Sequence, residues 1–92
     1  MKKVTVRIYY CTQCNWMLRA TWLAQELLHT FSDDIESVNL CPSTGGYFEI
    51  FCDDVSLWER KKEQGFPDAK RLKQRLRDHI DPLRQLGHID KQ

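Results

Sequence analysis

Hydrophobic side chains alternate with other residues near the start of the chain and then change to a helical spacing. Residues 4–10 alternate, which predicts a strand with one buried face. From residue 15 to residue 31 apolar side chains recur every three or four positions, which predicts an amphipathic helix with a broad apolar face. We expect Trp16 and Trp22 to pack in or near the core. The expected apolar positions are Val4, Val6, Ile8 and Tyr10 in the strand, and Trp16, Ala20, Leu23, Ala24, Leu27, Leu28 and Phe31 in the helix.

Three further strands are expected after this helix, at residues 35–41, 47–52 and 55–58. The middle one is apolar on both faces apart from Glu49, which is typical of a central strand. The last one follows the short turn Asp53-Asp54, so we expect it to pair with the strand before it as a hairpin.

The C-terminal third of the chain predicts one more helix and a tail. Gly65-Phe66-Pro67-Asp68 has the composition of a helix start, with Pro67 at the first helical position. A narrow apolar stripe continues as far as Asp81-Pro82, which ends the helix. The charged residues 59–64 are expected to be solvated. Residues 83–92 show no period, and we expect a packed or frayed tail there.

The order strand-helix-strand-strand-strand-helix determines where the loops lie. The first strand, first helix and second strand form a βαβ unit, whose two strands should be parallel. We expect the third strand to run antiparallel to the first, on its other side. The loop Pro42-Ser43-Thr44-Gly45-Gly46 would then cross over the carboxyl end of the first strand. The predicted fold class is therefore α/β in two layers, with a mixed four-stranded sheet.

Size and charge exclude several classes of protein. A chain of 92 residues predicts a single domain, 1–92, and its net charge of +1 makes no case for nucleic acid or an anionic membrane as partner. The basic residues of 60–62 and of the second helix are expected to form solvated faces. No stretch is long and apolar enough to span a membrane. No apolar segment follows Met1-Lys2-Lys3, so we expect no export signal and a cytoplasmic protein.

Cys11-Thr12-Gln13-Cys14 is the chemically distinctive stretch, because it lies between the first strand and the first helix. Two cysteines at this spacing can close a disulfide, and one thiol can resolve a mixed disulfide formed by the other. A helix N-terminus offers free N–H groups and a positive dipole, both of which lower the pKa of a thiol. Since Thr12 and Gln13 are uncharged, we expect the helix end to supply most of a moderate pKa shift.

Two other interpretations of the motif stay open. A structural zinc site needs four ligands, usually in two close pairs, whereas Cys41 and Cys52 are single and far apart. The histidines have no familiar spacing to them, so no metal is expected. The second alternative is a pair of thiols without a redox role.

The other cysteines and Glu49 are further candidates. Cys41 ends the second strand at the edge that holds the motif, so it is either an additional redox thiol or a thiol packed under the loop. Cys52 alternates with Phe48 and Ile50 and is expected in the core. Glu49 is expected to be solvated or paired with arginine, and the alternative is a buried acid near the site. The expected substrate-facing loop consists of Pro42, Ser43, Thr44, Gly45 and Gly46.

Taken together, these segments resemble the selenoprotein W-related proteins of the Rdx family, which also includes selenoproteins T and H. The similarity is greatest to short bacterial members that carry cysteine, and it runs through most of the chain. The segments that carry it are Tyr10-Cys11-Thr12-Gln13-Cys14 with Trp16, Thr44-Gly45-Gly46-Tyr47-Phe48-Glu49-Ile50, Trp58-Glu59-Arg60-Lys61, Gly65-Phe66-Pro67, and Leu72-Lys73 through Ile80.

The resemblance implies a thioredoxin-like fold with both helices on one face of the sheet. Thr5, Arg7 and Tyr9 would then lie on an uncovered face, open to solvent, a partner or a second copy of the chain. It implies a redox role for Cys11 and Cys14, with no bound cofactor and with glutathione as a candidate co-substrate. Cys14 takes the place of selenocysteine in animal members, which favours it as the attacking residue. Thioredoxin-like proteins attack with the first cysteine, and we expect Cys11 to attack on that basis.

Two functions remain open from the sequence. The first is a small thiol-disulfide oxidoreductase in cell redox homeostasis, with a protein or glutathione disulfide as substrate. The second is a redox-sensitive protein-binding module without turnover, whose disulfide switches docking. The sequence favours the first.

Overall fold

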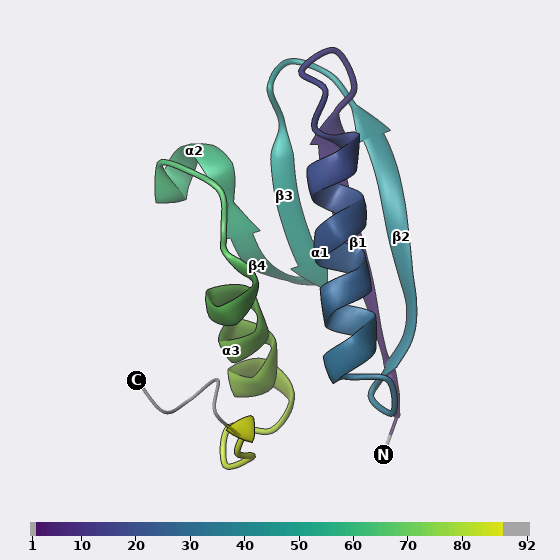
Figure 1. Ribbon diagram of the computed structural model, residues 1–92, viewed down its shortest axis with the longest axis vertical. Helices are drawn as coiled ribbons and strands as arrows, with labels where there is room; N and C mark the ends of the chain where they lie inside the picture. The colour runs from purple at the N-terminus through teal and green to yellow at the C-terminus, as the bar shows by residue number, and fades with distance from the viewer. Residues whose placement is uncertain (1, 88–92) are drawn as a thin grey trace.

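The computed structural model describes residues 2–87 and has the expected order of strands and main helices (Figure 1). Its elements are β1 (Val4–Cys11), α1 (Met17–Thr30), β2 (Ile35–Ser43), β3 (Phe48–Cys52), β4 (Val55–Glu59), α2 (Arg60–Glu63) and α3 (Ala69–Ile80). The four strands form one sheet in the order β2-β1-β3-β4. Strand β1 is parallel to β2 and antiparallel to β3, and β3 is antiparallel to β4. The predicted two-layer α/β class with a mixed sheet is confirmed.

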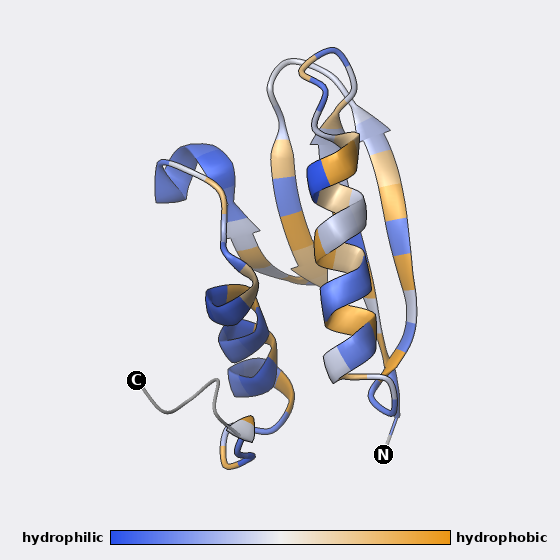
Figure 2. Ribbon diagram, in the orientation of Figure 1, coloured by the Kyte–Doolittle hydropathy of each residue, from blue (hydrophilic) through white to orange (hydrophobic). Residues whose placement is uncertain are grey.

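One hydrophobic core lies between the sheet and helices α1 and α3, which cover the same face. Ile8 of β1 is fully buried in one cluster with Leu23 of α1 and Leu72 and Leu76 of α3. Figure 2 shows α3 as largely hydrophilic, in keeping with the narrow apolar stripe predicted for it. The sheet and the two helices therefore share one continuous interior.

Helix α1 begins two residues later than predicted, and part of its apolar stripe is exposed. Asn15 has a φ of 62°, so it belongs to a turn and not to the helix. Trp16 packs against the core as expected. The prediction for Trp22 was wrong, because its side chain is 45% exposed. Leu23 faces the sheet. Trp22 precedes it in the helix and is rotated from it by about 100° around the helix axis, so its side chain is directed toward solvent.

The pairing of β3 with β4 contains a β-bulge, which changes the residues of β4 that are buried. Trp58 pairs with Ile50 and Ser56 pairs with Phe51, so Leu57 is the extra residue on its strand. The bulge allows two successive residues, Leu57 and Trp58, to be buried. Simple alternation would have exposed one of them.

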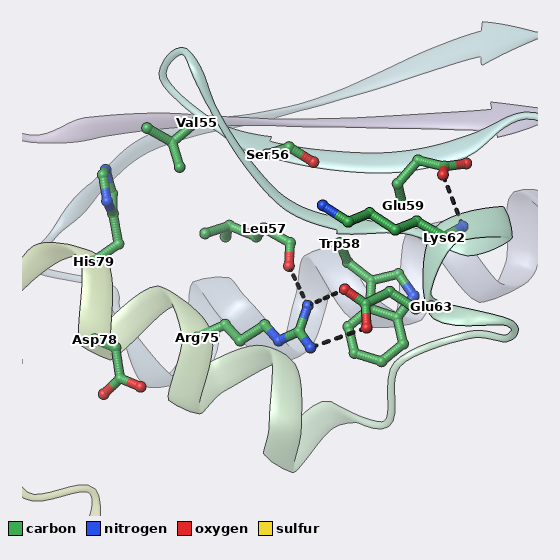
Figure 3. A pocket seen from close by; sticks show the side chains of 10 residues that line it. All are labelled: Val55, Ser56, Leu57, Trp58, Glu59, Lys62, Glu63, Arg75, Asp78 and His79. Atoms are coloured by element: carbon green, nitrogen blue, oxygen red, sulfur yellow. Dashed lines mark hydrogen bonds and ion pairs between the residues drawn. The ribbon is translucent and has the colours of Figure 1, made fainter.

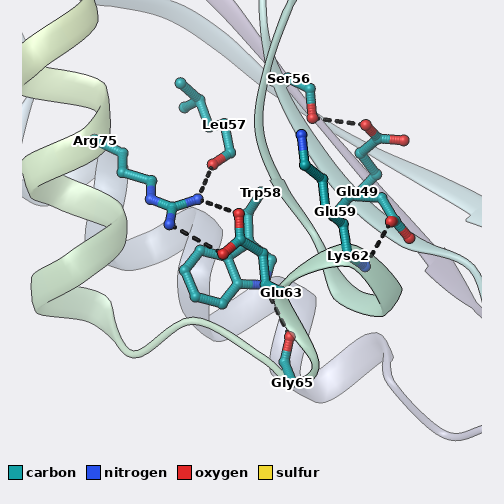
Figure 4. Close-up of polar contacts among 9 residues, drawn as sticks. All are labelled: Glu49, Ser56, Leu57, Trp58, Glu59, Lys62, Glu63, Gly65 and Arg75. Atoms are coloured by element: carbon teal, nitrogen blue, oxygen red, sulfur yellow. Dashed lines mark hydrogen bonds and ion pairs between the residues drawn. The ribbon is translucent and has the colours of Figure 1, made fainter.

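The charged segment 59–64 contains a short helix that was not predicted, and Lys61 and Lys62 are exposed as expected. Helix α2 is a single turn, and its N-cap is Glu59, whose carboxylate accepts hydrogen bonds from the backbone N–H groups of residues 61 and 62 at 3.1 and 2.9 Å. Arg75 of α3 donates two hydrogen bonds to Glu63, at 2.7 and 3.1 Å, and one to the carbonyl of Leu57, at 2.8 Å (Figure 4). These contacts hold α2 between β4 and α3.

Helix α3 and the segment after it also differ from expectation. Its N-cap is Asp68, whose side chain accepts a hydrogen bond from the N–H of Arg71 at 2.7 Å, so Pro67 precedes the helix and is not its first residue. After the helix, Arg84 forms an ion pair with Asp34 and residue 86 packs against the core. Arg84 and Leu86 are therefore packed whereas Leu83 is 91% exposed, and residues 88–92 lie outside the described residues.

Within residues 2–87, the second face of the sheet carries no helix but is partly covered by its own side chains. The guanidinium of Arg7 lies over the rings of Tyr9 and Phe51, at 5.7 and 5.1 Å from their centroids. The ring of Tyr9 also contacts that of Tyr47, with centroids 5.6 Å apart. Thr5, Arg7 and Tyr9 are half-buried as a result. No helix within residues 2–87 has the length and apolar composition needed to cross a membrane.

Candidate redox site

The cysteine motif lies at one end of the sheet, where β1 ends and the chain turns toward α1 (Figure 1). Cys11 is the last residue of β1 and pairs with Ser43 of β2. The following turn is closed by the N–H of Asn15, which donates to the carbonyl of Thr12 at 3.3 Å. Since α1 begins only at Met17, both cysteines precede the helix.

The connection between β2 and β3 crosses the carboxyl end of β1, as predicted, because β1 lies between these two strands. The carbonyl of Ser43 accepts hydrogen bonds from the N–H and the hydroxyl of Thr12, at 3.0 and 3.3 Å. The predicted loop is two residues too long, since Pro42 and Ser43 belong to β2. Proline is tolerated there because β2 is an edge strand.

The crossing loop needs its two glycines. Gly45 and Gly46 have φ angles of 70° and 72°, a region that other residues rarely adopt. The N–H of Tyr47 donates to the carbonyl of Thr44 at 3.4 Å and closes this turn. Thr44 and Gly45 are exposed and Gly46 is half-buried.

Hydrogen-bond donors surround the two sulfur atoms. The thiol of Cys14 donates to the sulfur of Cys11, and the N–H of Gly46 donates to both sulfurs. The N–H groups of Gln13 and Cys14 donate to Cys11 as well. These contacts, with that of the Cys14 thiol the largest, hold the pKa of Cys11 below its ordinary value in spite of burial. The pKa of Cys14 is raised by the same hydrogen bond, by burial and by the charge on Cys11.

The activating groups differ from those predicted. We expected the N-terminus of α1 to lower the thiol pKa, but the N–H groups that do so belong to the motif and to Gly46. The physical principle is the same, because backbone N–H groups favour the thiolate wherever they come from. The source is a turn and a crossing loop, since the helix starts three residues after Cys14.

Access to the two sulfurs also differs. Residue Cys11 is 1% exposed, whereas Cys14 is half-buried and in contact with solvent. Both are free thiols in this structure. A molecule that approaches this end of the sheet therefore meets Cys14 first.

The remaining cysteines lie apart from this pair. Cys41 pairs with Tyr9, and its thiol approaches the carbonyl of Asn39 at 3.7 Å. It is half-buried and two residues before Ser43, the partner of Cys11. Cys52 is fully buried in the core, as predicted, and burial raises the pKa of its thiol to about 11.

Neither Glu49 nor a metal cluster adds to the site. Glu49 is half-buried on the helix-free face and accepts hydrogen bonds from the hydroxyls of Tyr47 and Ser56, at 2.5 and 2.6 Å. Those hydroxyls, and not an arginine, are the partners found for its carboxylate. Over residues 2–87, no three side chains of His, Cys, Asp or Glu converge to hold a metal ion.

An exposed apolar surface lies in the first turn of α1, which begins three residues after Cys14, and the sequence analysis missed it. Met17 is 55% exposed and Leu18 is 83% exposed, both in the first turn of α1. A cavity of about 410 Å³ lies between these two residues and Tyr10, Thr12 and Asn15. The unbroken apolar run from residue 16 to residue 18 was a signal for it, because a helix cannot bury three successive residues.

A larger cavity lies elsewhere. It has a volume of about 480 Å³ and opens between β4, α2 and α3 (Figure 3). The ion pair between Glu63 and Arg75 crosses it, and neither Cys11 nor Cys14 lines it. It is therefore not the redox site.

Comparison with known proteins gives a consistent result. The profile of the Rdx family matches residues 5–78. The crystal structure of a selenoprotein W-related protein from Vibrio cholerae is 68% identical, with a TM-score of 0.85, and the match covers 87% of this chain and 100% of that one. A crystal structure from Bordetella parapertussis is 53% identical, with a TM-score of 0.84, over 86% of this chain and 100% of that one. The search of curated proteins gave no significant match.

Proposed function

This chain belongs to the Rdx family, and we propose that it is a small thiol-disulfide oxidoreductase in which Cys11 and Cys14 alternate between dithiol and disulfide. The observation that carries the proposal is the placement of two free thiols, Cys11 and Cys14, at the end of β1 under the crossing loop, where hydrogen bonding from Cys14 and from backbone N–H groups lowers the pKa of Cys11. A thiolate is the nucleophile in thiol-disulfide exchange, and this arrangement stabilises one thiolate within the pair.

We propose Cys14 as the attacking residue, in place of Cys11 as expected from thioredoxin-like proteins. The lowered pKa favours Cys11 as the thiolate, whereas access favours Cys14. Solvent access determines which cysteine attacks, because the attacking sulfur must reach the substrate disulfide in line with its S–S bond. A proton, in contrast, passes easily between two hydrogen-bonded thiols. Cys11 therefore takes up the proton of Cys14 and frees the Cys14 thiolate.

The exchange then proceeds in two steps. The Cys14 thiolate attacks one sulfur of the substrate disulfide, the substrate S–S bond breaks, and the other substrate sulfur leaves as a thiolate that takes up a proton. Cys11 loses its proton to solvent and attacks the sulfur of Cys14, which releases the second substrate thiol and forms the Cys11–Cys14 disulfide. Two electrons pass to the substrate, and a dithiol or glutathione returns them.

A protein disulfide fits the surroundings of Cys14 better than glutathione disulfide does. The adjoining surface is formed by Met17 and Leu18, with Trp22 one turn further along α1 and 45% exposed. Methionine adapts its shape to varied apolar partners. Glutathione is small and charged and would leave this surface in water, so we propose a polypeptide substrate whose cysteine is flanked by apolar side chains.

A redox titration tests the proposed function. The reduced protein is equilibrated with glutathione mixtures and its free thiols are trapped rapidly and counted by mass. We expect one reversible disulfide with a midpoint between about −300 and −180 mV. Cys11→Ser and Cys14→Ser should abolish it, whereas the control Cys41→Ser should leave it unchanged. A wild-type protein that forms no Cys11–Cys14 disulfide at any potential rules the proposal out.

The redox-sensitive binding module is the second candidate. The exposed apolar residues Met17 and Leu18 in the first turn of α1 favour it, because they offer a partner an apolar contact close in sequence to the motif. Turnover distinguishes the two functions. Sustained reduction of a protein disulfide in the presence of glutathione or thioredoxin reductase selects the oxidoreductase. A disulfide that forms without turnover, together with partner binding in one redox state only, selects the module.

A further inference from the structure

Arg60, the first residue of α2, reaches the loop above the two cysteines. Its Nε and Nη2 atoms donate hydrogen bonds to the carbonyl of Gly46, at 3.2 and 3.0 Å. Its guanidinium also lies over the ring of Trp16, 4.8 Å from the centroid. One side chain thus connects α2, the crossing loop and the start of α1.

We propose that Arg60 is a positioning residue for the thiol-disulfide chemistry, because it fixes Gly46 so that the N–H of that glycine points at the sulfurs of Cys11 and Cys14. The inference rests on the proposed function of the pair and adds a third participant to it. Arg60 touches neither substrate nor sulfur, and it acts through the backbone of Gly46.

Gly46 needs such a contact to stay in place. Its N–H and its carbonyl belong to consecutive peptide groups, which rotate about the two backbone dihedrals of a residue without a side chain. Free rotation there would move the N–H away from the sulfurs. Two hydrogen bonds from a rigid guanidinium to one carbonyl remove much of that freedom.

The position of Arg60 is itself fixed by the packing around α2. The indole N–H of Trp58 donates to the carbonyl of Gly65 at 2.9 Å (Figure 4), which closes the chain around α2. The ring of Phe66 then packs edge-on against Trp16, with centroids 4.9 Å apart. The aromatic ring under the guanidinium is therefore held by the segment that follows α2.

The charge of Arg60 acts in the same direction as the hydrogen bond that it supports. The N–H of Gly46 and the positive charge of Arg60 both lower the pKa of Cys14, against the larger contribution of Cys11 that raises it. Arg60 therefore favours the thiolate by charge and by geometry.

The test compares Arg60→Met and Arg60→Lys with Lys61→Met, a matched control on the exposed next residue of α2. The rate of alkylation of the Cys14 thiol is measured against pH. The equilibrium constant between the Cys11–Cys14 dithiol and its disulfide is measured in glutathione mixtures. For Arg60→Met we expect the alkylation midpoint to rise by about one pH unit, and hence alkylation at neutral pH about tenfold slower. The equilibrium should move toward the disulfide by about tenfold, or ~30 mV to more negative potential.

Arg60→Lys keeps a positive charge but lacks the planar fork, so it should lie between Arg60→Met and the wild type in both measurements. Lys61→Met should match the wild type. If the wild type forms its disulfide and Arg60→Met and Arg60→Lys retain the wild-type pH profile and equilibrium constant, the role of Arg60 is refuted and the proposed function stands. If the wild type forms no disulfide, the proposed function itself fails.

Discussion

Arg84 binds the carboxylate of Asp34 through two hydrogen bonds, at 2.7 and 3.0 Å, although the residues are 50 positions apart in sequence. The backbone carbonyl of Asp34 also accepts a hydrogen bond from the N–H of Val4 at 2.9 Å. The ion pair thus joins the segment after α3 to the turn before β2 and to the first strand. It lies at the end of the sheet away from the cysteines.

Arg84→Met should destabilise the protein in a pH-dependent way. The guanidinium holds the pKa of Asp34 below the ordinary value of 3.8, first through its hydrogen bonds and then through its charge. A lowered carboxyl pKa contributes stability above the unfolded pKa and loses it as the pH falls through the folded pKa. At neutral pH we expect a loss of about 1 kcal/mol, measured by urea denaturation. The difference in free energy of unfolding from the wild type should shrink below pH ~3.8. The exposed control Gln85→Ala should show no such difference. A difference that does not depend on pH would contradict the role of the Asp34 carboxylate.

Glu26→Gln should lower the melting temperature more than the double variant Glu26→Gln/Lys73→Met does. Lys73 is 7% exposed, and its ammonium binds Glu26 at 2.8 Å. Removing the carboxylate charge leaves a buried ammonium poorly compensated, whereas replacing the lysine as well removes that charge. Calorimetry at neutral pH measures the order of the three proteins. Equal melting temperatures for the single and double variants would show that the ammonium reaches solvent.

Cys11→Ser and Cys14→Ser should differ in their reaction with a small disulfide. Cys11→Ser keeps the accessible sulfur of Cys14, so it should form a mixed disulfide that persists for want of a resolving thiol. Cys14→Ser keeps only the buried sulfur of Cys11 and should react at least about tenfold more slowly, in keeping with its 1% exposure. Mass spectrometry over time measures both rates. Faster modification of Cys14→Ser would reverse the assignment of attacker and resolver.

Leu18→Gln should change the preference of the protein between substrates. Leu18 is 83% exposed, so the substitution removes an apolar contact surface at little cost to folding. We expect reduction of an apolar peptide disulfide to slow by about three- to tenfold, the effect of losing one or two apolar contacts, while reduction of glutathione disulfide stays the same. Leu83→Gln, 91% exposed and after α3, is the matched control. Equal slowing with both substrates would indicate damage to the redox pair instead.

The sequence predicted the arrangement around the cysteines because that arrangement follows from chain order. Alternation in residues 4–10 identified the buried face of β1, and the βαβ rule placed β2 beside it. With β3 on the other side, the connection that contains Gly45 and Gly46 had to cross above Cys11. None of these steps needed a side-chain contact.

What the sequence left out depends on contacts between distant segments. The bulge at Leu57 cannot be read from periodicity, because it is defined by pairing with β3. The contact of Arg60 with Gly46 joins residues 14 positions apart through a helix of one turn that looked like a solvated segment. The activating role given to the end of α1 failed because Asn15 makes a turn that delays the helix.

Strand β4 is an outer edge of the sheet, and such edges invite strands from other molecules to pair with them. Three features of β4 make such pairing less favourable. Its strand is short and carries a bulge, and the carbonyl of Leu57 is already bound by Arg75. A second chain that approached β4 would have to displace an arginine that Glu63 also holds. The ion pair between Glu63 and Arg75 thereby leaves β4 one fewer free carbonyl for an incoming strand.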